Sequence, residues 1–363
     1  MDIIMAPKEI LSFSKMHVGA EQVVSAKYDE LLMKDGKIYK DTMSGLWNVT
    51  LGYSNDNIKQ AMINQLNKLP YASNFSGYQS ETTEKYANAL CKKTAMDRVY
   101  FTNSGSAAVE TAIKVTGRTV VNCAKHSYHG STILSANVSD QRINEFWNIK
   151  DPIEVRKFSN ADELRKLCTP NTFTIIEPVV GAGGVYSWDD DVWQVLKEYQ
   201  ANDGIVIFDE TVTGFGKLGT MFAFEKFNFQ PDIIVLGKGI TNGYFPMGAC
   251  LINERIAKTL KMFNHGFTFS GHPVGCAAGL ETIKEVEKLE LNHVQINGVT
   301  RQQGCMGAID FATPKQSLTF IKKMREKGYI LEDGSENVST AVFCLPFIFK
   351  EHDKFEEAIK ECI

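Results

Sequence analysis

The fold is decided by residues 204–243, which read GIVIFDETVTGFGKLGTMFAFEKFNFQPDIIVLGKGITNG. Residues 205–208 and 233–236 are short, continuous apolar runs, a pattern that predicts strands buried on both faces of a sheet. The first run stops at Asp209, and the second stops just before Lys238. Because ligands bind at the carboxyl ends of the strands in a parallel α/β sheet, we expect this carboxylate and this amine at one edge.

Asp209 and Lys238 are the two kinds of group that pyridoxal phosphate chemistry requires. A lysine amine forms a Schiff base with the aldehyde, and a carboxylate keeps the pyridine nitrogen protonated so that the ring withdraws electrons. An aspartate after a strand and a Gly-Lys-Gly turn are also common structural features of loops. The pair therefore supports a cofactor site only if other parts of the chain supply a phosphate site and a ring-stacking residue.

Length and composition are those of a soluble globular protein. The 363 residues suffice for one large domain with a smaller companion, or for two medium domains. The formal net charge of −4 gives no electrostatic basis for binding nucleic acid or an anionic membrane. No apolar run approaches the roughly 20 residues that a membrane-spanning helix requires.

The eight cysteines are scattered, and none belongs to a CxxC pair. The sequence therefore predicts no metal site and no redox motif. The first residues, MDIIMAPKEILSF, lack the basic start and long apolar segment of a signal peptide. We expect a cytoplasmic protein.

Strand and helix patterns alternate along most of the chain. A hairpin is predicted at Asp35-Gly36, and a helix is predicted after Asn55 or Asp56. Further predicted strands cover residues 98–102, 120–123, 173–176, 247–251, 306–311 and 342–349, and further predicted helices cover residues 80–94, 190–200, 316–327 and 354–362.

A phosphate site is indicated where the strand at 98–102 runs into Ser104, Gly105 and Ser106 and then into a helix. The first N–H groups of a helix are unpaired and carry the positive end of its dipole, which suits a phosphate dianion. Ser104 and Ser106 add hydroxyl donors. Either serine can instead be a simple N-cap, and the motif alone does not decide between the two roles.

Three further residues are expected at the same edge of the sheet. Tyr128 follows a predicted strand and can stack on a flat cofactor, whereas the adjacent His129 is more typical of a structural histidine than of a catalyst. Glu177 brings another carboxylate to the end of a strand. The glycine cluster at 181–184 lacks the GxGxxG spacing, so a dinucleotide site is not favoured.

Together, the motifs resemble those of the class III pyridoxal phosphate-dependent aminotransferases, the group of ornithine, diaminopelargonate and ω-amino acid aminotransferases. The resemblance covers about residues 25–285 and, more loosely, the C-terminal part. It implies an α/β protein of the type I aminotransferase fold, with a mostly parallel central sheet, helices on both faces and a smaller α+β domain. Its motifs, in chain order, are SGSAAVETAIK at 104–114, YHG at 128–130, EPV at 177–179, DETVTGFGKLG at 209–219, Lys238 and HGFTFSGHPVGCAAG at 265–279.

The resemblance implies pyridoxal 5'-phosphate as the cofactor and a role for each catalytic residue. Lys238 is similar to the Schiff-base lysine, which also moves a proton between the substrate and the cofactor. Asp209 is similar to the partner of the pyridine nitrogen, and Tyr128 to the ring that stacks on the cofactor. Ser104, Gly105 and Ser106 are similar to the phosphate cradle.

Four other residues take their expected roles from the same resemblance. Thr211 stands where the family usually has a valine on the opposite face of the cofactor, and Glu177 stands near the mouth of the site. Thr268 stands where members reach across a dimer interface to the cofactor phosphate of the partner, which implies a homodimer. Trp47 stands where an aromatic wall lines the substrate pocket, although taken alone it is more typical of a packing anchor.

Two features depart from the family pattern. Lys217 replaces the arginine of the GFGR segment, and a lysine cannot reproduce a planar, bidentate contact. The strand AVFCLPFIF, at residues 341–349, carries no arginine where many members bind the α-carboxylate of the substrate. The sequence therefore favours substrates whose reacting carbon lacks a carboxylate.

We predict a ping-pong aminotransferase that moves an amino group from a small-molecule or peptide donor to an aldehyde, ketone or keto acid. Its expected parts are an N-terminal segment at 1–45, a large cofactor-binding domain at 46–285 and a small α+β domain at 286–363. An aminomutase or a decarboxylase on the same scaffold is the alternative within the enzymes. A non-catalytic scaffold protein is the alternative of another class.

Overall fold

The computed structural model describes residues 21–74, 77–140, 152–260, 263–334 and 339–363. The first 20 residues, on which the prediction about a signal peptide rests, lie outside this part of the chain. Seven strands form the central sheet: β4 (Arg98–Thr102), β5 (Val120–Ala124), β6 (Glu154–Phe158), β7 (Thr172–Ile176), β10 (Ile205–Asp209), β11 (Ile233–Leu236) and β12 (Gly248–Ile252).

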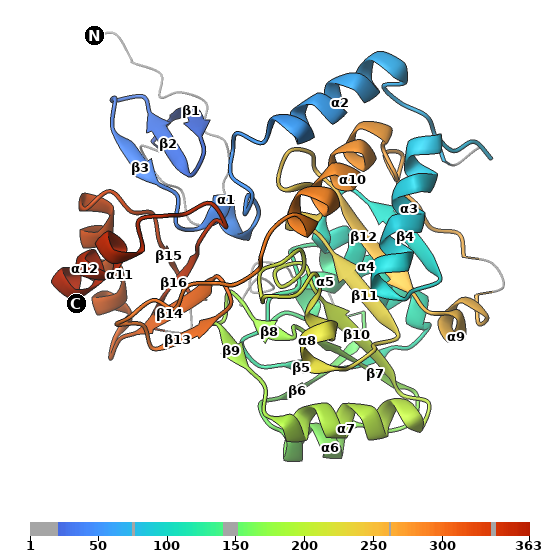
Figure 1. Cartoon of the computed structure of the whole chain (residues 1–363). Helices are drawn as coiled ribbons and strands as arrows, with labels where there is room; N and C mark the ends of the chain where they lie inside the picture. The colour runs from blue at the N-terminus through green and yellow to red at the C-terminus, as the bar shows by residue number, and fades with distance from the viewer. Residues whose placement is uncertain (1–20, 75–76, 141–151, 261–262, 335–338) are drawn as a thin grey trace, which may run out of the picture.

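The order of strands in this sheet is β4-β12-β11-β10-β7-β5-β6 (Figure 1). The strand β12 is antiparallel to both of its neighbours, whereas the pairings among the other five adjacent strands are parallel. The central sheet is thus mostly parallel, as predicted.

Helices cover both faces of this sheet (Figure 1). Ile205 and Ile207 pack in one cluster with α4 (Gly105–Thr116), and Val206 and Phe208 pack in another with α7 (Asp190–Ala201). Because successive side chains of a strand point to opposite faces, the continuous apolar run of β10 reflects burial on both sides. The remaining longer helices are α2 (Asp56–Lys68), α3 (Glu81–Thr94), α10 (Pro273–Glu287), α11 (Pro314–Glu326) and α12 (His352–Cys362).

Shorter elements fill the connections between these. They are α5 (Ile133–Asn137), α6 (Ala161–Leu167), α8 (Ala223–Phe227), α9 (Glu254–Ala257), the 3₁₀ turn η2 (Lys238–Thr241), and the strands β8 (Val179–Val180) and β9 (Tyr186–Ser187). None of the helices in the described ranges is both long enough and apolar enough to span a membrane.

Most predicted elements are found within one or two residues of their expected ends. The strand predicted at 342–349 is wrong in its second half, because β16 (Thr340–Cys344) ends before Pro346, which has no N–H to donate to a strand ladder. The edge strand β6 was not predicted, since its sequence EVRKF carries three charged residues in five.

Two small sheets lie beside the central one (Figure 1). The first contains β1 (Val23–Lys27), β2 (Glu30–Met33) and β3 (Ile38–Lys40), and the second contains β13 (Arg301–Gln303), β14 (Met306–Asp310), β15 (Glu332–Asp333) and β16. The predicted hairpin is confirmed, with Gly36 at φ +86° between β2 and β3. A bridge between Lys40 and Tyr329 joins the N-terminal part to the C-terminal part. The domain boundaries at 45 and 285 stay a prediction.

A left-handed turn, α1 (Ser44–Trp47), leads from the first small sheet toward the central one. All four of its residues have positive φ, from 49° to 67°, although L-residues disfavour this conformation by roughly 1–2 kcal/mol each. The buried carboxylate of Asp41 holds the turn: it accepts hydrogen bonds from Met43 N (3.1 Å), Gly45 N (2.6 Å) and the Tyr53 hydroxyl (2.5 Å).

We expect Asp41→Ala to destabilise the protein by about 3 kcal/mol, because three donors lose a buried, charged acceptor. Urea unfolding followed by far-ultraviolet circular dichroism measures this as a lower midpoint. Asp56→Ala is the matched control, since the Asp56 side chain is 90% exposed, and its midpoint should barely move. Equal midpoints for the two variants would contradict the role assigned to Asp41.

Candidate active site

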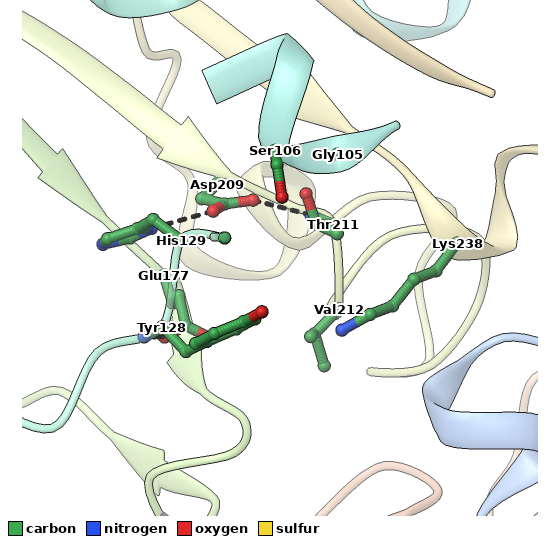
Figure 2. A pocket seen from close by; sticks show the side chains of 10 residues that line it. Gly105, Ser106, Tyr128, His129, Glu177, Asp209, Thr211, Val212 and Lys238 are labelled. Carbon is green, nitrogen blue, oxygen red and sulfur yellow. Dashed lines mark hydrogen bonds and ion pairs between the residues drawn. The ribbon is translucent and has the colours of Figure 1, made fainter. Parts of the chain in front are cut away.

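A pocket opens at the carboxyl edge of the central sheet, where β10, β7 and β11 end (Figure 2). Seven of the residues predicted for the site line it: Gly105, Ser106, Tyr128, Glu177, Asp209, Thr211 and Lys238. His129, Gly130 and Val212 complete the lining. Residues from five separate stretches of sequence thus meet in one cavity.

Lys238 enters the pocket from the turn after β11, and its side chain and that of Tyr128 point toward one another (Figure 2). Its backbone is left-handed, with φ +44°. Burial, which disfavours the ammonium form, lowers the pKa of Lys238 to about 8 against the opposing effect of Glu177 and Asp209. With this pKa, about a tenth of the amine is uncharged at pH 7, far more than for an ordinary lysine.

Asp209 is the last residue of β10 and is 2% exposed. Its Oδ2 lies 2.8 Å from His129 Nδ1, and its Oδ1 accepts a hydrogen bond from Thr211 N at 3.0 Å (Figure 2). Both carboxylate oxygens are thus fixed by neighbours. An aspartate held in this way has a fixed orientation toward a ligand in the pocket.

The sequence favoured a structural role for His129, and its contact with Asp209 was not predicted. The imidazole is buried, and its Nε2 has no hydrogen-bond partner among the described residues. The only sequence signal was its place beside Tyr128 in a loop at the carboxyl edge. The contact itself joins residues 80 positions apart, so it became visible only in the fold.

One end of the pocket is formed by the start of α4. Ser104 is the N-cap: its Oγ accepts a hydrogen bond from Ala107 N at 3.1 Å, so this serine does not line the pocket. Gly105 follows, and a Cβ at this position would lie 2.9 Å from Thr211 Cγ2. The absence of a side chain keeps the helix start open to a ligand, as a phosphate site requires.

Glu177 fixes the loop that carries the aromatic ring. Its carboxylate accepts hydrogen bonds from Tyr128 N (3.0 Å) and Gly181 N (3.1 Å). Burial raises the pKa of Glu177, and burial likewise raises the pKa of the Tyr128 hydroxyl. Both residues line the pocket together with Lys238.

Two predicted residues lie apart from this pocket. Trp47 is 2% exposed and packs in the core cluster of the C-terminal sheet, which also contains Val212. Thr268 is exposed, and its carbonyl oxygen accepts a hydrogen bond from the Tyr71 hydroxyl. Among the described residues, no cluster of three or more His, Cys, Asp or Glu side chains could hold a metal ion.

The groups in the pocket fit pyridoxal phosphate. An open helix start suits the phosphate, a buried carboxylate suits the ring nitrogen, and a lysine of lowered pKa suits the aldehyde. Thr211 Oγ1 adds a buried hydroxyl that has no partner within the described residues and is therefore available to a ligand. The geometry defines a site for this cofactor.

Comparison with known proteins agrees with this geometry. The family model for aminotransferase class-III matches residues 21–294. The chain is 30% identical to an acetylornithine aminotransferase of Archaeoglobus fulgidus over 89% of this chain and 90% of that one. It is 33% identical to a vanillin aminotransferase of Capsicum chinense, over 74% of this chain and 68% of that one.

A solved structure extends the likeness to the whole chain. The amine transaminase from an uncultivated Pseudomonas species, crystallised in its PLP-bound form, superimposes with a TM-score of 0.90 at 26% identity and covers 98% of both chains. The protein belongs to the class III aminotransferases. It is a pyridoxal phosphate-dependent enzyme that catalyses transamination.

We expect Thr211→Val to stabilise the cofactor-free protein by about 1 kcal/mol, because it removes a buried hydroxyl that has no partner among the described residues. The extra stability that the cofactor confers should fall in the same variant. Thermal unfolding with and without pyridoxal phosphate measures both effects. Thr111→Val, which removes a buried hydroxyl bonded to Ala107 O, is the control and should lower the midpoint. A lower midpoint for cofactor-free Thr211→Val would contradict the prediction.

Proposed function

We propose that Lys238 is the residue that bonds to the aldehyde of the cofactor and then moves the substrate proton. The observation that carries this assignment is the pocket itself, which brings an amine of lowered pKa into one cavity with Asp209 and the start of α4. When bound, the cofactor supplies an electron-withdrawing ring that stabilises negative charge at the substrate carbon. A Lys238 amine with a pKa of about 8 can both accept and release a proton near neutral pH.

The other residues of the pocket act on the position and charge of the cofactor. Asp209, oriented by His129, stabilises a protonated ring nitrogen, and Tyr128, oriented by Glu177, covers one face of the ring. The N–H groups at Gly105 and the hydroxyl of Ser106 hold the phosphate, with Ser104 acting through the helix cap. Thr211 packs on the opposite face, where its free hydroxyl can donate to the cofactor.

We further propose that the amino donor or acceptor has no carboxylate on its reacting carbon. The arginines in the described ranges are all bound elsewhere, and Arg142 lies outside these ranges. Their partners are Glu254 for Arg98, Thr172 O and Asp203 O for Arg118, Glu154 for Arg156, Glu198 for Arg165, Asp232 for Arg255, Asp310 for Arg301 and Glu21 for Arg325. None of these arginines lines the pocket, so the usual bidentate partner of a carboxylate is missing there.

The relatives support this class of substrate without fixing it. One is named for acetylornithine and another, at similar identity, for vanillin, which is an aldehyde without a carboxylate. An aromatic aldehyde or a terminal amine would need only apolar contacts at Val212 and space beside Lys238. A peptide terminus that carries a reactive amine belongs to the same class.

A spectroscopic half-reaction screen tests the proposed function. Primary amines, ω-amino acids and α-amino acids are added separately to the cofactor-loaded enzyme, and loss of the visible absorbance of the bound cofactor identifies a donor. We expect terminal amines to react at least tenfold faster than α-amino acids. This corresponds to an activation free energy that is lower by about 1.4 kcal/mol. Lys238→Ala, which keeps the rest of the pocket, should not react.

The outcomes separate the alternatives. A strict preference for α-amino and α-keto acids in both half-reactions would overturn the proposed substrate class. An amino group returned to the same molecule, with no transfer to pyruvate or 2-oxoglutarate, would favour an aminomutase, and release of carbon dioxide would favour a decarboxylase. A purified wild type that shows no visible absorbance of bound cofactor would favour a non-catalytic scaffold.

We also propose that the enzyme is a homodimer in which Thr268 reaches the site of the partner. Thr268 is exposed and lies outside the pocket of its own chain, and neighbouring Phe269 and Tyr71 are exposed aromatic residues in contact with each other. An exposed aromatic pair of this kind favours an interface.

A cytoplasmic location is proposed as well, and it is supported by the eight cysteines, which are all free.

Subunit complementation tests the shared site. Thr268→Asp places a negative charge where a phosphate is expected, and Lys238→Ala removes the amine, so each variant alone should be inactive. Co-expression in one cell should restore about a quarter of the wild-type activity, because half of the dimers are mixed and each has one intact site. No recovery in a mixed population of folded dimers would contradict the contribution of Thr268.

A further inference from the structure

Lys217 is a lysine that is completely buried in the loop after β10. Its Nζ donates a hydrogen bond to the carbonyl oxygen of Gly214 at 3.0 Å, and the described residues show no ion pair between it and a carboxylate. Fully buried lysines are rare unless they are paired, because burial of an ammonium group is costly. An apolar side chain would fill the same space without this cost, so the amine itself calls for an explanation.

The Lys217 amine lies against the turn that carries Lys238. A Cβ placed on Gly239, the residue that follows Lys238, would lie 3.0 Å from Lys217 Nζ and 3.2 Å from Phe215 Cβ. The turn needs support at this point, because Lys238 has a left-handed backbone with φ +44°. Such conformations persist only where the surrounding structure holds them.

The main chain at Lys217 is fixed from the opposite side as well. Its carbonyl oxygen accepts a hydrogen bond from Cys305 N at 2.9 Å, and a Cβ on Gly304 would lie 1.9 Å from this oxygen. The turn itself is anchored at its far end, where the Tyr86 hydroxyl donates to Ile240 O at 2.8 Å. Lys217 therefore connects the C-terminal segment to the near end of the Lys238 turn.

We propose that Lys217 is a positioning residue, which holds the Lys238 turn in its left-handed conformation and keeps a second amine beside that of Lys238. The inference rests on the proposed role of Lys238. It adds a residue that does not line the pocket and yet sets the position and the proton affinity of the amine that does.

The ionisable groups around each amine determine whether Lys217 raises or lowers the pKa of Lys238. Burial and the Lys217 amine lower the pKa of Lys238, whereas Glu177, Asp209 and Cys344 raise it. Burial lowers the pKa of Lys217, and the groups that oppose it are Cys344, Cys305 and Glu210. Because one cation disfavours another nearby, removal of the Lys217 amine should raise the pKa of Lys238 above its wild-type value.

Lys217→Met in the full-length chain tests the proposal, since methionine has nearly the same length but no amine. The first measurement is the pH dependence of Lys238 modification by fluorodinitrobenzene in the cofactor-free protein, quantified by mass spectrometry of the peptide. We expect its midpoint to move to higher pH. The second measurement is the split between kcat and KM with the donor found for the wild type, for which we expect kcat to fall about tenfold and KM to change less than threefold.

Lys226→Met is the matched control. Lys226 is an exposed lysine nine positions further along the chain, and its amine donates to Gln303 Oε1 rather than to the Lys238 turn. Its variant should keep the wild-type titration midpoint and kcat. Should Lys217→Met fail to fold, Gly239→Ala carries the test, because its Cβ would press on the Lys217 amine and should lower kcat in the same way.

An unchanged titration midpoint together with an unchanged kcat in Lys217→Met would overturn the proposal. So would a wild-type kcat in folded Gly239→Ala. These results are distinguishable from failure of the proposed function: a wild type that reacts with no donor overturns the function, whereas the titration of Lys238 in the cofactor-free chain still reports on Lys217.

Discussion

The parallel pairing of β10 with β11 is the constraint on which the site depends. Asp209 is in register with Val235, so the chain that leaves β11 reaches Lys238 at the edge where β10 ends. Alternation along β10 then decides which carboxylate enters the pocket. Asp209 shares a face with Ile207, which packs against α4, and α4 begins at the phosphate end of the pocket. A slip of one residue would turn Glu210 toward this face in place of Asp209.

Glu210, the residue after Asp209, is bound on the other face of the sheet. It is completely buried and accepts hydrogen bonds from Ala223 N (2.7 Å) and Phe224 N (3.1 Å) at the start of α8. Burial raises the pKa of Glu210 to about 7, whereas burial lowers the pKa of Lys217 and of Lys238 nearby. In each case burial disfavours the charged form of the group. Of two adjacent acidic residues, Asp209 thus lines the pocket and Glu210 binds the start of α8.

Much of the site could be predicted from the sequence because its residues stand at the ends of local elements. An apolar run that stops at Asp209, and a strand that enters a small-residue helix start at Gly105, are visible without a fold. Their convergence follows from the rule for parallel sheets. The contact of His129 with Asp209 could not be predicted, because it joins loops far apart in sequence. The left-handed turn of α1 was equally hidden, since its stability depends on Asp41 and on packing rather than on residue preference.

The small sheets contribute to one wall of the pocket through Val212. Val212 lines the pocket and also packs in the cluster that contains Trp47 and the strands of the C-terminal sheet. The resemblance to the family implied a place for Trp47 in the substrate wall, and in the structure Trp47 is buried in the same cluster as Val212. Contacts that form only in the transition state raise kcat, whereas contacts made equally with the substrate and the transition state lower KM. The described lining of the pocket contains no arginine, and its one aliphatic side chain, that of Val212, is held in the cluster where the N-terminal and C-terminal segments pack together.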